Sequence, residues 1–480
     1  MKRIIAVILS LILIFSLVGC GKQKREIIKL TLSTEDSEAI LAAAGIRLPA
    51  AETTAASGTN VKWFAWWDDF HNYSDDEIVQ TGFWTFQEKY GCDVEWIECT
   101  WSDRFDGLAN LTLSGEAPDF APNDLGSFPV RTMKGMYQAV DDYVDYSDPL
   151  WEGVKDFVYK YLSLNGKAYM FVTDITYGDV CVYNRRVMEE WGFDDPAELY
   201  YNDEWTWDVF YNMCMDFSDP DDDRYALDSW SFSAGLMRST GIPVVEYDTE
   251  TRTYIDNTDS PELERAANLL YDIAKNNCVY PWWNNGWSLR GSSEGEGINS
   301  GKGKMLIFIG YDYTFTGPVD NITPVFGDIA GGEIMYCPMP RDANGDGHYY
   351  TESSPTGYFL VNGAQNPEGV ALLAACQRFK VLDPTVVSID KKQKEEIYLW
   401  TDEMLNMYDI MHDIANSENM IVTGFGYDNA LASVISAYED NGHVMNASTW
   451  AQIKESNSEK LKYYLDELNT QVKEYENANS

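Results

Sequence analysis

The chain of 480 residues is long enough to form two domains, each with its own hydrophobic core. Its formal net charge of −42 excludes a nucleic-acid partner, because phosphate binding needs a basic surface, and it argues equally against a polyanionic ligand. A neutral or cationic ligand remains compatible with this charge. The 16 Trp, 31 Tyr and 20 Phe exceed ordinary usage, so some aromatic side chains are available to line a cleft as well as the core.

The N-terminal residues have the pattern of an export signal. Lys2 and Arg3 precede an apolar stretch, 4–17, that is short for a membrane span, and Leu17-Val18-Gly19-Cys20 follows. This ending resembles the lipobox of bacterial lipoproteins, which implies a signal peptide over residues 1–19 and a diacylglycerol on Cys20. A plain secretory signal with an incidental Cys is the alternative. Residues 20–60 are then expected to be the lipidated Cys and a tether, in which 27–32 or 39–46 can form a short strand or helix.

Cysteine and histidine usage argues against disulfides and against a metal centre. Apart from Cys20, the chain has seven Cys, an odd number, and no C-x-x-C spacing. We expect mostly buried thiols. The four His do not pair at ligand spacing, so we predict neither a metal nor a cofactor.

From residue 61 the sequence alternates strand and helix signals. Residues 61–67 and 93–97 have strand composition. Ser74-x-x-Glu77 is a capping box for a helix that closes at Gly91, and a second helix closes at Gly115. This order predicts a mainly parallel sheet with right-handed crossovers.

The stretch 166–193 predicts a crossing between two domains. Residues 168–172 and 180–183 are short strand-like runs, separated by a polar, Gly-containing break over 173–179. Asn184 is a candidate N-cap for a helix over 185–191, and Gly192 suits its left-handed C-terminal end.

Further helix and turn signals follow. Thr206 is expected to cap a helix that starts at Trp207, and 247–254 reads as a hairpin. Ser260-Pro261 should begin a helix that continues to about residue 276, and an acidic amphipathic helix is expected over about 458–475.

These motifs together resemble the extracellular solute-binding proteins of bacterial ABC importers, in the carbohydrate-binding subgroup that includes maltose-binding protein. The resemblance lies in N-G-K-x-Y and V-Y-N-R-x-x-x-E-E-x-G-F of the crossing, in S-G-x-A-P-D at 114–119, and in the segments at 205–208, 299–309 and 366–368. It covers about residues 61–471. No single motif is diagnostic, but their order and spacing are specific.

The resemblance implies an α/β, two-lobed periplasmic-binding-protein-like fold of type II, with each lobe a mainly parallel sheet flanked by helices and a ligand cleft at the hinge. It implies a first lobe of residues 61–174 plus 334–383 and a second lobe of 175–333 plus 384–480. It also implies a monomer, held outside the cell by its lipid anchor, that delivers a carbohydrate to the permease subunits of an ABC transporter in the membrane and catalyses no reaction.

Candidate ligand-binding residues are those that follow predicted strands, because α/β sheets bind ligands beyond the carboxyl ends of their strands. By family alignment, Tyr311 to Tyr313 occupy the place of a stacking aromatic, and Trp230 falls near another. The candidates are Trp66, Trp67, Asp68, Asp69, Asn123, Asp124, Asp174, Tyr177, Trp230, Tyr311, Asp312 and Tyr427. The aromatic and polar loop 282–287 is expected at the rim.

Aromatic faces beside Asp and Asn suit a sugar, which presents apolar C–H faces and a belt of hydroxyls. Residue by residue, core packing is the commoner role of a Trp or Tyr. Side chains alternate along a strand, so Trp66 and Trp67 cannot both enter one core layer. Asp68 and Asp69 are alternatively caps of the following loop.

Residues 342–347 resemble the start of a calcium loop, D-x-N-x-D-G. The Glu expected at its twelfth position is replaced by Ser353, and Glu352 comes one place early. A tight turn is therefore preferred to a calcium site.

Three other functions remain open. An extracellular glycoside hydrolase needs a pair of carboxylates, which the 77 acidic residues cannot single out, and no nucleophile elbow, phosphate loop or zinc motif occurs. A peptide-binding protein of the same fold needs an Arg for the carboxylate, and none is evident. The same fold can also present a ligand to a sensor.

Overall fold

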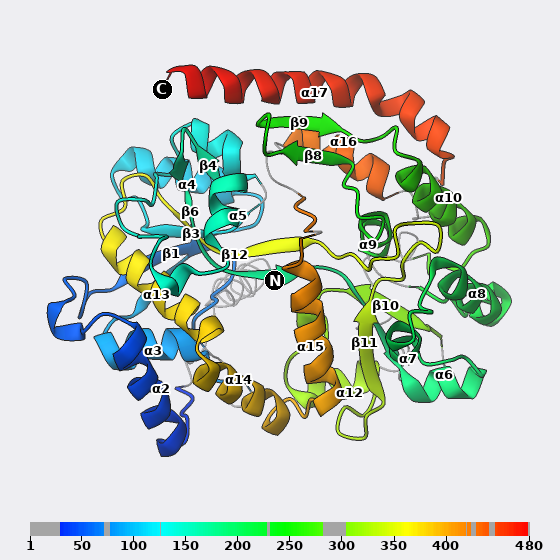
Figure 1. Cartoon of the computed structure of the whole chain (residues 1–480), viewed down its shortest axis with the longest axis horizontal. Coiled ribbons are helices and arrows are strands. Elements are labelled where there is room, and N and C mark those ends of the chain that lie inside the picture. The colour runs from blue at the N-terminus through cyan, green and yellow to red at the C-terminus, as the bar shows by residue number, and fades with distance from the viewer. Residues whose placement is uncertain are drawn as a thin grey trace, which may run out of the picture.

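The computed structural model describes residues 29–71, 77–124, 126–227, 231–281, 304–418, 420–423, 429–440 and 447–478. Cys20, Trp230, Tyr427 and the loop 282–287 lie outside these ranges. Within them, no helix is both long and apolar enough to cross a membrane. Figure 1 shows two groups of helices and strands side by side, with α17 running along the top of both.

A five-stranded mixed sheet forms the centre of what we call the first lobe. Its strand order is β2-β1-β3-β12-β6, with β2 and β3 parallel to β1 and β12 antiparallel to both of its neighbours. The strands are β1 (Val61–Ala65), β2 (Val94–Glu98), β3 (Phe120–Pro122), β6 (Met170–Tyr177) and β12 (Ser353–Leu360). The helices and small strands of this lobe are α3 (Thr81–Tyr90), α4 (Arg104–Ser114), α5 (Lys155–Tyr161), α13 (Pro367–Leu382), β4 (Ser163–Leu164) and β5 (Lys167–Ala168).

The long strands β6 and β12 pair with each other and lead out of the first lobe. Strand β6 continues to Tyr177, so the irregular break expected over 173–179 shrinks to a turn at Gly178 and Asp179. The pairing shifts register between Thr356 and Gly357. A Cβ at Gly357 would lie 1.8 Å from the carbonyl oxygen of Phe171, and its φ of +142° also favours glycine, so only a residue without a side chain fits this bulge.

The second lobe is built on a smaller sheet of order β10-β7-β11, in which both outer strands are antiparallel to β7. The expectation of a mainly parallel sheet is wrong for this lobe. The strands are β7 (Val180–Asn184), β10 (Ile307–Gly310) and β11 (Ile334–Pro338), and a hairpin joins β8 (Val245–Asp248) to β9 (Thr253–Asp256). The helices are α6 (Arg185–Trp191), α7 (Pro196–Tyr201), α8 (Trp207–Phe217), α9 (Phe232–Arg238), α10 (Pro261–Lys275), α12 (Val319–Phe326), α15 (Asp402–Ala415), α16 (Asn429–Glu439) and α17 (Trp450–Ala478).

Two of the expected lobe boundaries disagree with the contacts. Strand β11 pairs with β7 of the second lobe, so the chain does not return to the first lobe at residue 334 but only with β12. Helix α14 (Pro384–Glu396), expected in the second lobe, packs on the first. Its Asp390 accepts a hydrogen bond from Thr81 Oγ1 at 2.9 Å, and Gln393 Oε1 accepts one from the Val79 amide at 2.7 Å.

Part of the expected tether is an ordered helix, α2 (Thr34–Arg47). Ile40 and Ala44 are fully buried. Ion pairs attach it to the first lobe, from Lys392 to Asp36 at 3.0 Å and from Arg47 to Asp383 at 2.7 Å. The described fold therefore begins before residue 61.

Local signals placed most helix ends well. Asn184 caps α6 by accepting from the Val187 amide, and Gly192 ends the helix with a φ of 72°. Ser260 caps α10, with Pro261 in its first turn. Helix α3 is the exception, because it starts at Thr81, after the expected capping box. Six of the seven cysteines that follow Cys20 are buried, and all seven are free thiols, as predicted.

Candidate functional site

A cavity of about 1060 Å³ lies between the two lobes. The ends of β1 and β3 and the crossing strands β6 and β12 form its base. Helices α13, α14 and α15 and the 3₁₀ turn η6 (Asp312–Thr314) form its sides. Its lining includes Trp63, Trp67, Asp69, Asn123, Asp174, Tyr313, Lys380, Asp390, Lys394, Tyr408 and His412.

Four of the predicted ligand-binding residues line this cavity: Trp67, Asp69, Asn123 and Asp174. The first two follow β1. The Trp67 side chain is 36% exposed, and its carbonyl accepts a hydrogen bond from Trp63 Nε1 at 3.2 Å, which fixes the backbone at the strand end. Trp67 is thus partly exposed at the cavity, while its backbone is held by the core.

Asn123 follows β3, and Asp174 lies within β6. Asn123 Nδ2 donates to the Pro355 carbonyl at 2.6 Å, while its buried Oδ1 has no hydrogen-bond partner among the described residues. Asp174 lies 4.0 Å from Arg378 Nη1, and burial raises the pKa of its carboxyl. An acceptor and a carboxylate are therefore available beside Trp67.

Three other candidates from the first lobe have internal roles instead. Asp68 accepts from the Phe70 amide at 3.1 Å and pairs with the His71 ring at 2.9 Å, so it caps the loop, as the alternative had it. Asp124 pairs with Arg104 at 2.5 Å. Trp66 packs edge-on against Trp67 and Trp101 outside the cavity lining.

Tyr177, Tyr311 and Asp312 do not belong to the cavity lining. Tyr177 is buried and donates to Asp312 Oδ2 at 3.1 Å. Tyr311 stacks on Tyr313 with ring centroids 5.9 Å apart, and its hydroxyl lies 3.4 Å from Glu352 Oε2. The side chain of Tyr313, the other end of the expected aromatic segment, is 62% exposed and lines the cavity, whereas Tyr311 does not.

Sequence reasoning missed the lining residues on α13, α14 and α15. Strand ends were searched, whereas Lys380, Asp390, Lys394, Tyr408 and His412 lie on helices. No local signal distinguishes these positions from ordinary half-buried helix faces. The packing of α13 and α15 on β6, and of α14 on α13, brings these residues to the cavity.

Titratable groups in the cavity have shifted pKa values. Water reaches the Asp69 carboxylate through the cavity, but the surrounding protein atoms raise its pKa to about 6. Burial lowers the pKa of Lys394 to about 8, against the opposing effect of Asp312 and Asp390. Burial also lowers the pKa of His412. In all three groups, burial in the cavity wall disfavours the charged form.

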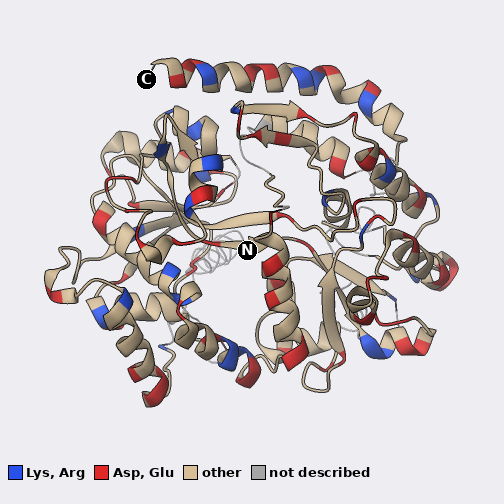
Figure 2. Ribbon diagram, in the orientation of Figure 1, with Lys and Arg blue, Asp and Glu red and all other residues tan. Residues whose placement is uncertain are grey.

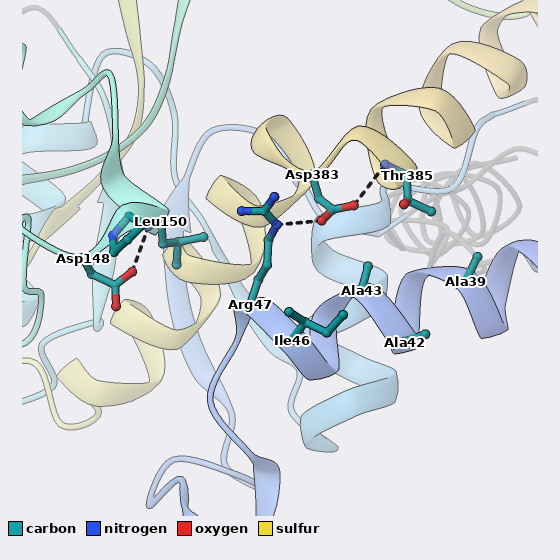
Figure 3. A pocket seen from close by; sticks show the side chains of 10 residues that line it. Ala39, Ala42, Ala43, Ile46, Arg47, Asp148, Leu150, Asp383 and Thr385 are labelled. Carbon is teal, nitrogen blue, oxygen red and sulfur yellow. Dashed lines mark hydrogen bonds and ion pairs between the residues drawn. The ribbon is translucent and has the colours of Figure 1, made fainter.

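A second hollow, of about 840 Å³, lies between α2 and the loop that holds Asp148 and Leu150 (Figure 3). Its polar groups already have partners: Asp383 accepts from Arg47 and caps Thr385, and Asp148 caps Leu150. The rest of its lining is mainly alanine. It offers a ligand few hydrogen bonds, and the interlobe cavity is the better candidate.

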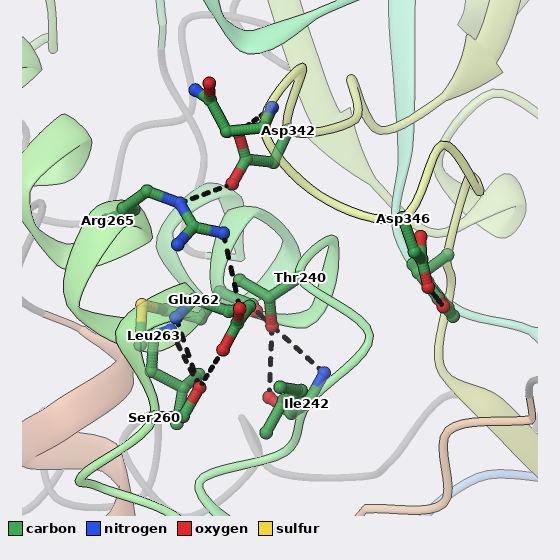
Figure 4. Close-up of polar contacts among 11 residues, drawn as sticks. Thr240, Ile242, Ser260, Glu262, Leu263, Arg265, Asp342 and Asp346 are labelled. Atoms are coloured by element: carbon green, nitrogen blue, oxygen red, sulfur yellow. Dashed lines mark hydrogen bonds and ion pairs between the residues drawn. The ribbon is translucent and has the colours of Figure 1, made fainter.

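The calcium-like loop is organised by protein contacts. Arg265 Nε donates to Asp342 Oδ2 at 2.7 Å, and Asp342 Oδ1 accepts from the Asn344 amide at 2.8 Å. Asp346 accepts from the His348 amide at 3.0 Å and stands apart from Asp342 (Figure 4). Within the described ranges, no three His, Cys, Asp or Glu residues are grouped as metal ligands. The geometry is that of a turn.

A family model matches part of the chain. Residues 83–296 match the family model of the bacterial extracellular solute-binding proteins. No curated protein matches the chain.

Three solved structures with the same fold are representative. The ABC substrate-binding protein Lmo0181 of Listeria monocytogenes, in complex with cycloalternan, aligns with a TM-score of 0.58 at 14% identity over 86% of this chain and 99% of that one. The galacto-N-biose/lacto-N-biose I-binding protein of Bifidobacterium longum aligns with a TM-score of 0.57 at 16% identity, over 85% of this chain and 97% of that one. The cyclic α-maltosyl-1,6-maltose binding protein of Arthrobacter globiformis aligns with a TM-score of 0.56 at 14% identity, over 85% of this chain and 98% of that one. At these identities the likeness establishes the two-lobed fold.

Proposed function

From its match to the extracellular solute-binding family over residues 83–296 and its two-lobed fold, we propose that the chain binds a carbohydrate, most simply an oligosaccharide, in the interlobe cavity. The observation on which this rests is the cavity itself. It lies between two lobes joined by paired crossing strands, and it combines the exposed rings of Trp67 and Tyr313 with carboxylates and amides. The neighbours in this fold are sugar-binding proteins or complexes with sugars.

The chemistry of the lining suits a sugar. Flat aromatic faces pack on C–H faces, and Asp69, Asn123 and Asp174 can accept or donate around a hydroxyl belt. An aromatic contact contributes about 0.5–1.5 kcal/mol beyond burial, and a hydrogen bond to a charged group about 1.5–3 kcal/mol. A few of each, less the cost of association, reach the roughly −8 kcal/mol of micromolar binding.

We further propose that the first lobe consists of α2, residues 61–177 and 353–396, and the second of residues 180–338 and 402–478. A ligand that touches both lobes would stabilise their closed arrangement by its additional contacts there. The closed monomer would then dock on the permease of an ABC transporter, and no reaction would be catalysed by this chain.

The lipobox-like ending at Cys20 supports a lipid-anchored protein on the outer side of the cell membrane, the side that the family's extracellular role implies. Because Lys29 pairs with Glu88 at 2.9 Å, and Leu30 and Leu32 pack against the core, only residues 21–28 would remain as a tether. Fully extended, such a tether spans roughly 28 Å, so the first lobe would stay close to the membrane.

A thermal-shift screen of residues 21–480 against oligosaccharides, monosaccharides and peptides tests the proposal. A ligand that binds only the folded state raises the melting temperature by mass action, by an amount equivalent to about 2.7 kcal/mol at one hundred times Kd. We expect a shift with one class of glycan and unchanged glycan on chromatography afterwards. A shift with peptides alone, or hydrolysis of the glycan, would contradict the proposal.

A further inference from the structure

A contact between the two lobes lies away from the cavity, at the C-terminal end of α17. Figure 1 shows this end of the helix over the first lobe, at the top of the view. Arg252, in the turn between β8 and β9, donates from Nη2 to the Ser163 carbonyl of β4 at 2.8 Å. The hydroxyls of Tyr475 on α17 and of Tyr169, just before β6, lie 3.3 Å apart. Both contacts join the second lobe to the first without using the crossing strands.

The β8–β9 hairpin and α17, which we call the strap, are bound to each other and act as one unit. Asn469 of α17 accepts from the Tyr254 amide at 2.7 Å and donates to the Tyr254 carbonyl at 3.0 Å. Arg252 Nη2 also pairs with Glu476 at 2.6 Å, so one guanidinium both holds α17 and contacts β4. Figure 2 shows acidic and basic positions alternating along α17. Specific contacts, rather than a charge of one sign, therefore place the helix across the lobes.

The strap and the cavity lie on opposite sides of the crossing strands. Strands β6 and β12 run across the middle of Figure 1, with the strap above them and α14 and α15, which line the cavity, below. On the cavity side, Lys391 of α14 pairs with Asp409 of α15 at 2.6 Å. A rotation of the lobes about the crossing strands that narrows the cavity therefore widens the gap that the strap spans.

We propose that the strap holds the cavity open: its contacts with Ser163 and Tyr169 stabilise the present arrangement of the lobes and oppose their closure around a ligand. This inference rests on the proposed function and adds control of the same site by residues that never touch the ligand. A contact that exists in only one of two arrangements shifts the equilibrium between them by its own free energy. The apparent affinity is the intrinsic affinity multiplied by the fraction of chains in the binding arrangement, so the strap lowers it.

Two substitutions release the strap with little disturbance of its own fold. Arg252 has a φ of 56°, a backbone conformation that Asn tolerates, and the Asn side chain is too short to contact Ser163. Tyr475→Phe removes only the hydroxyl that faces Tyr169. Lys454→Met is the control, because Lys454 lies on the same helix but pairs with Asp259 inside the second lobe, at 3.0 Å.

Calorimetric titration of residues 21–480 with the glycan that shifts the melting temperature compares the double variant Arg252→Asn/Tyr475→Phe with the wild type. We expect the double variant to bind about three- to tenfold more tightly, because hydrogen bonds made only in the open arrangement are lost. Lys454→Met should bind as the wild type does. A substitution that merely damages the fold weakens binding, so a gain in affinity is specific to a released strap. Unchanged or weaker binding by the double variant would overturn the inference.

Small-angle X-ray scattering tests the strap without any ligand. We expect the unliganded double variant and wild type to differ in radius of gyration, because the lobes of the variant spend more time closed. Identical scattering of the two unliganded proteins would overturn the inference, whether or not a glycan binds. Failure of every glycan to bind would overturn the proposed function, and the scattering would still decide whether the strap holds the lobes apart.

Discussion

At the scale of single residues, the loop after β1 shows how one short segment serves both structure and binding. Asp68 and Asp69 are neighbours, yet Asp68 is turned into the loop, where it accepts from the Phe70 amide and pairs with His71, whereas Asp69 lines the cavity. The sequence offered both roles for the pair without assigning them. The direction of each side chain, which depends on the folded loop, makes the assignment.

His71 provides a pH-dependent test of this loop. Its ring pairs with Asp68 at 2.9 Å and with Asp93 at 3.4 Å, and the hydrogen bond to Asp68 is the main cause that raises its pKa to about 9. Because the folded pKa lies above the unfolded value of 6.5, this stabilisation is fully present below pH 6.5 and is lost as the pH rises through about 9. We expect His71→Gln to lower the free energy of unfolding by up to about 3 kcal/mol at pH 6.

The measurement is urea unfolding of the wild type and the variant at pH 6, 7.5 and 9.5. The difference between them should shrink steadily towards the highest pH. A difference that stays constant over this range would show that the charge of His71 contributes nothing.

At the scale of elements, helix α2 is longer and more firmly attached than the sequence suggested. Its stretch was expected to be part of a tether, because it is rich in Ala, Thr, Ser and Glu, although the sequence also allowed a short helix over 39–46. The helix packs on the first lobe through contacts with α3 and α14, and these contacts cannot be read from the residues of α2 themselves. Ser33, whose side chain accepts from the Asp36 amide, is a local cap signal that could have indicated the helix start.

Two isoleucines of α2 form a matched pair for testing its role. Ile40 is fully buried, and Ile46, near the end of the helix, is 87% exposed. We expect Ile40→Ala to lower the free energy of unfolding by about 2–4 kcal/mol, because it leaves a cavity at the contact with the first lobe. Ile46→Ala should change it by less than about 0.5 kcal/mol.

Chemical denaturation followed by tryptophan fluorescence measures both variants. Equal, small effects of the two substitutions would mean that α2 does not belong to the cooperative fold. The tether would then be as long as the sequence suggested.

At the scale of the whole molecule, the local patterns predicted strands, helices and a crossing at 166–193, and the resemblance of their order to a known family implied the two-lobed fold. The lobe to which each strand and helix belongs was harder to predict. Strand β11 and helix α14 carry no local mark of the lobe they join, and both were assigned to the wrong lobe. Contacts between segments far apart in the sequence decide which lobe each element joins.

The same distinction applies to the cavity. Trp67, Asp69 and Asn123 follow strands, and the rule for strand ends found them, whereas Asp174 lies within β6. Further lining residues lie on α13, α14 and α15. The amphipathic pattern of these helices indicates which positions are buried, but not which positions of the three helices face the same cavity. Positions such as Lys394 therefore emerge only from the folded chain.

The central claim is that a sugar binds in the interlobe cavity. Calorimetric titration of two tryptophan variants tests it most directly. The titrant is the glycan that shifts the melting temperature of the wild type. Trp67 lines the cavity, whereas Trp101 is 56% exposed and stacks on Arg104 outside it. We predict one binding site per chain, a loss of affinity of tenfold or more for Trp67→Ala, and a change of less than about threefold for Trp101→Ala. Unchanged binding by Trp67→Ala would contradict the account, since the sugar would then lie elsewhere.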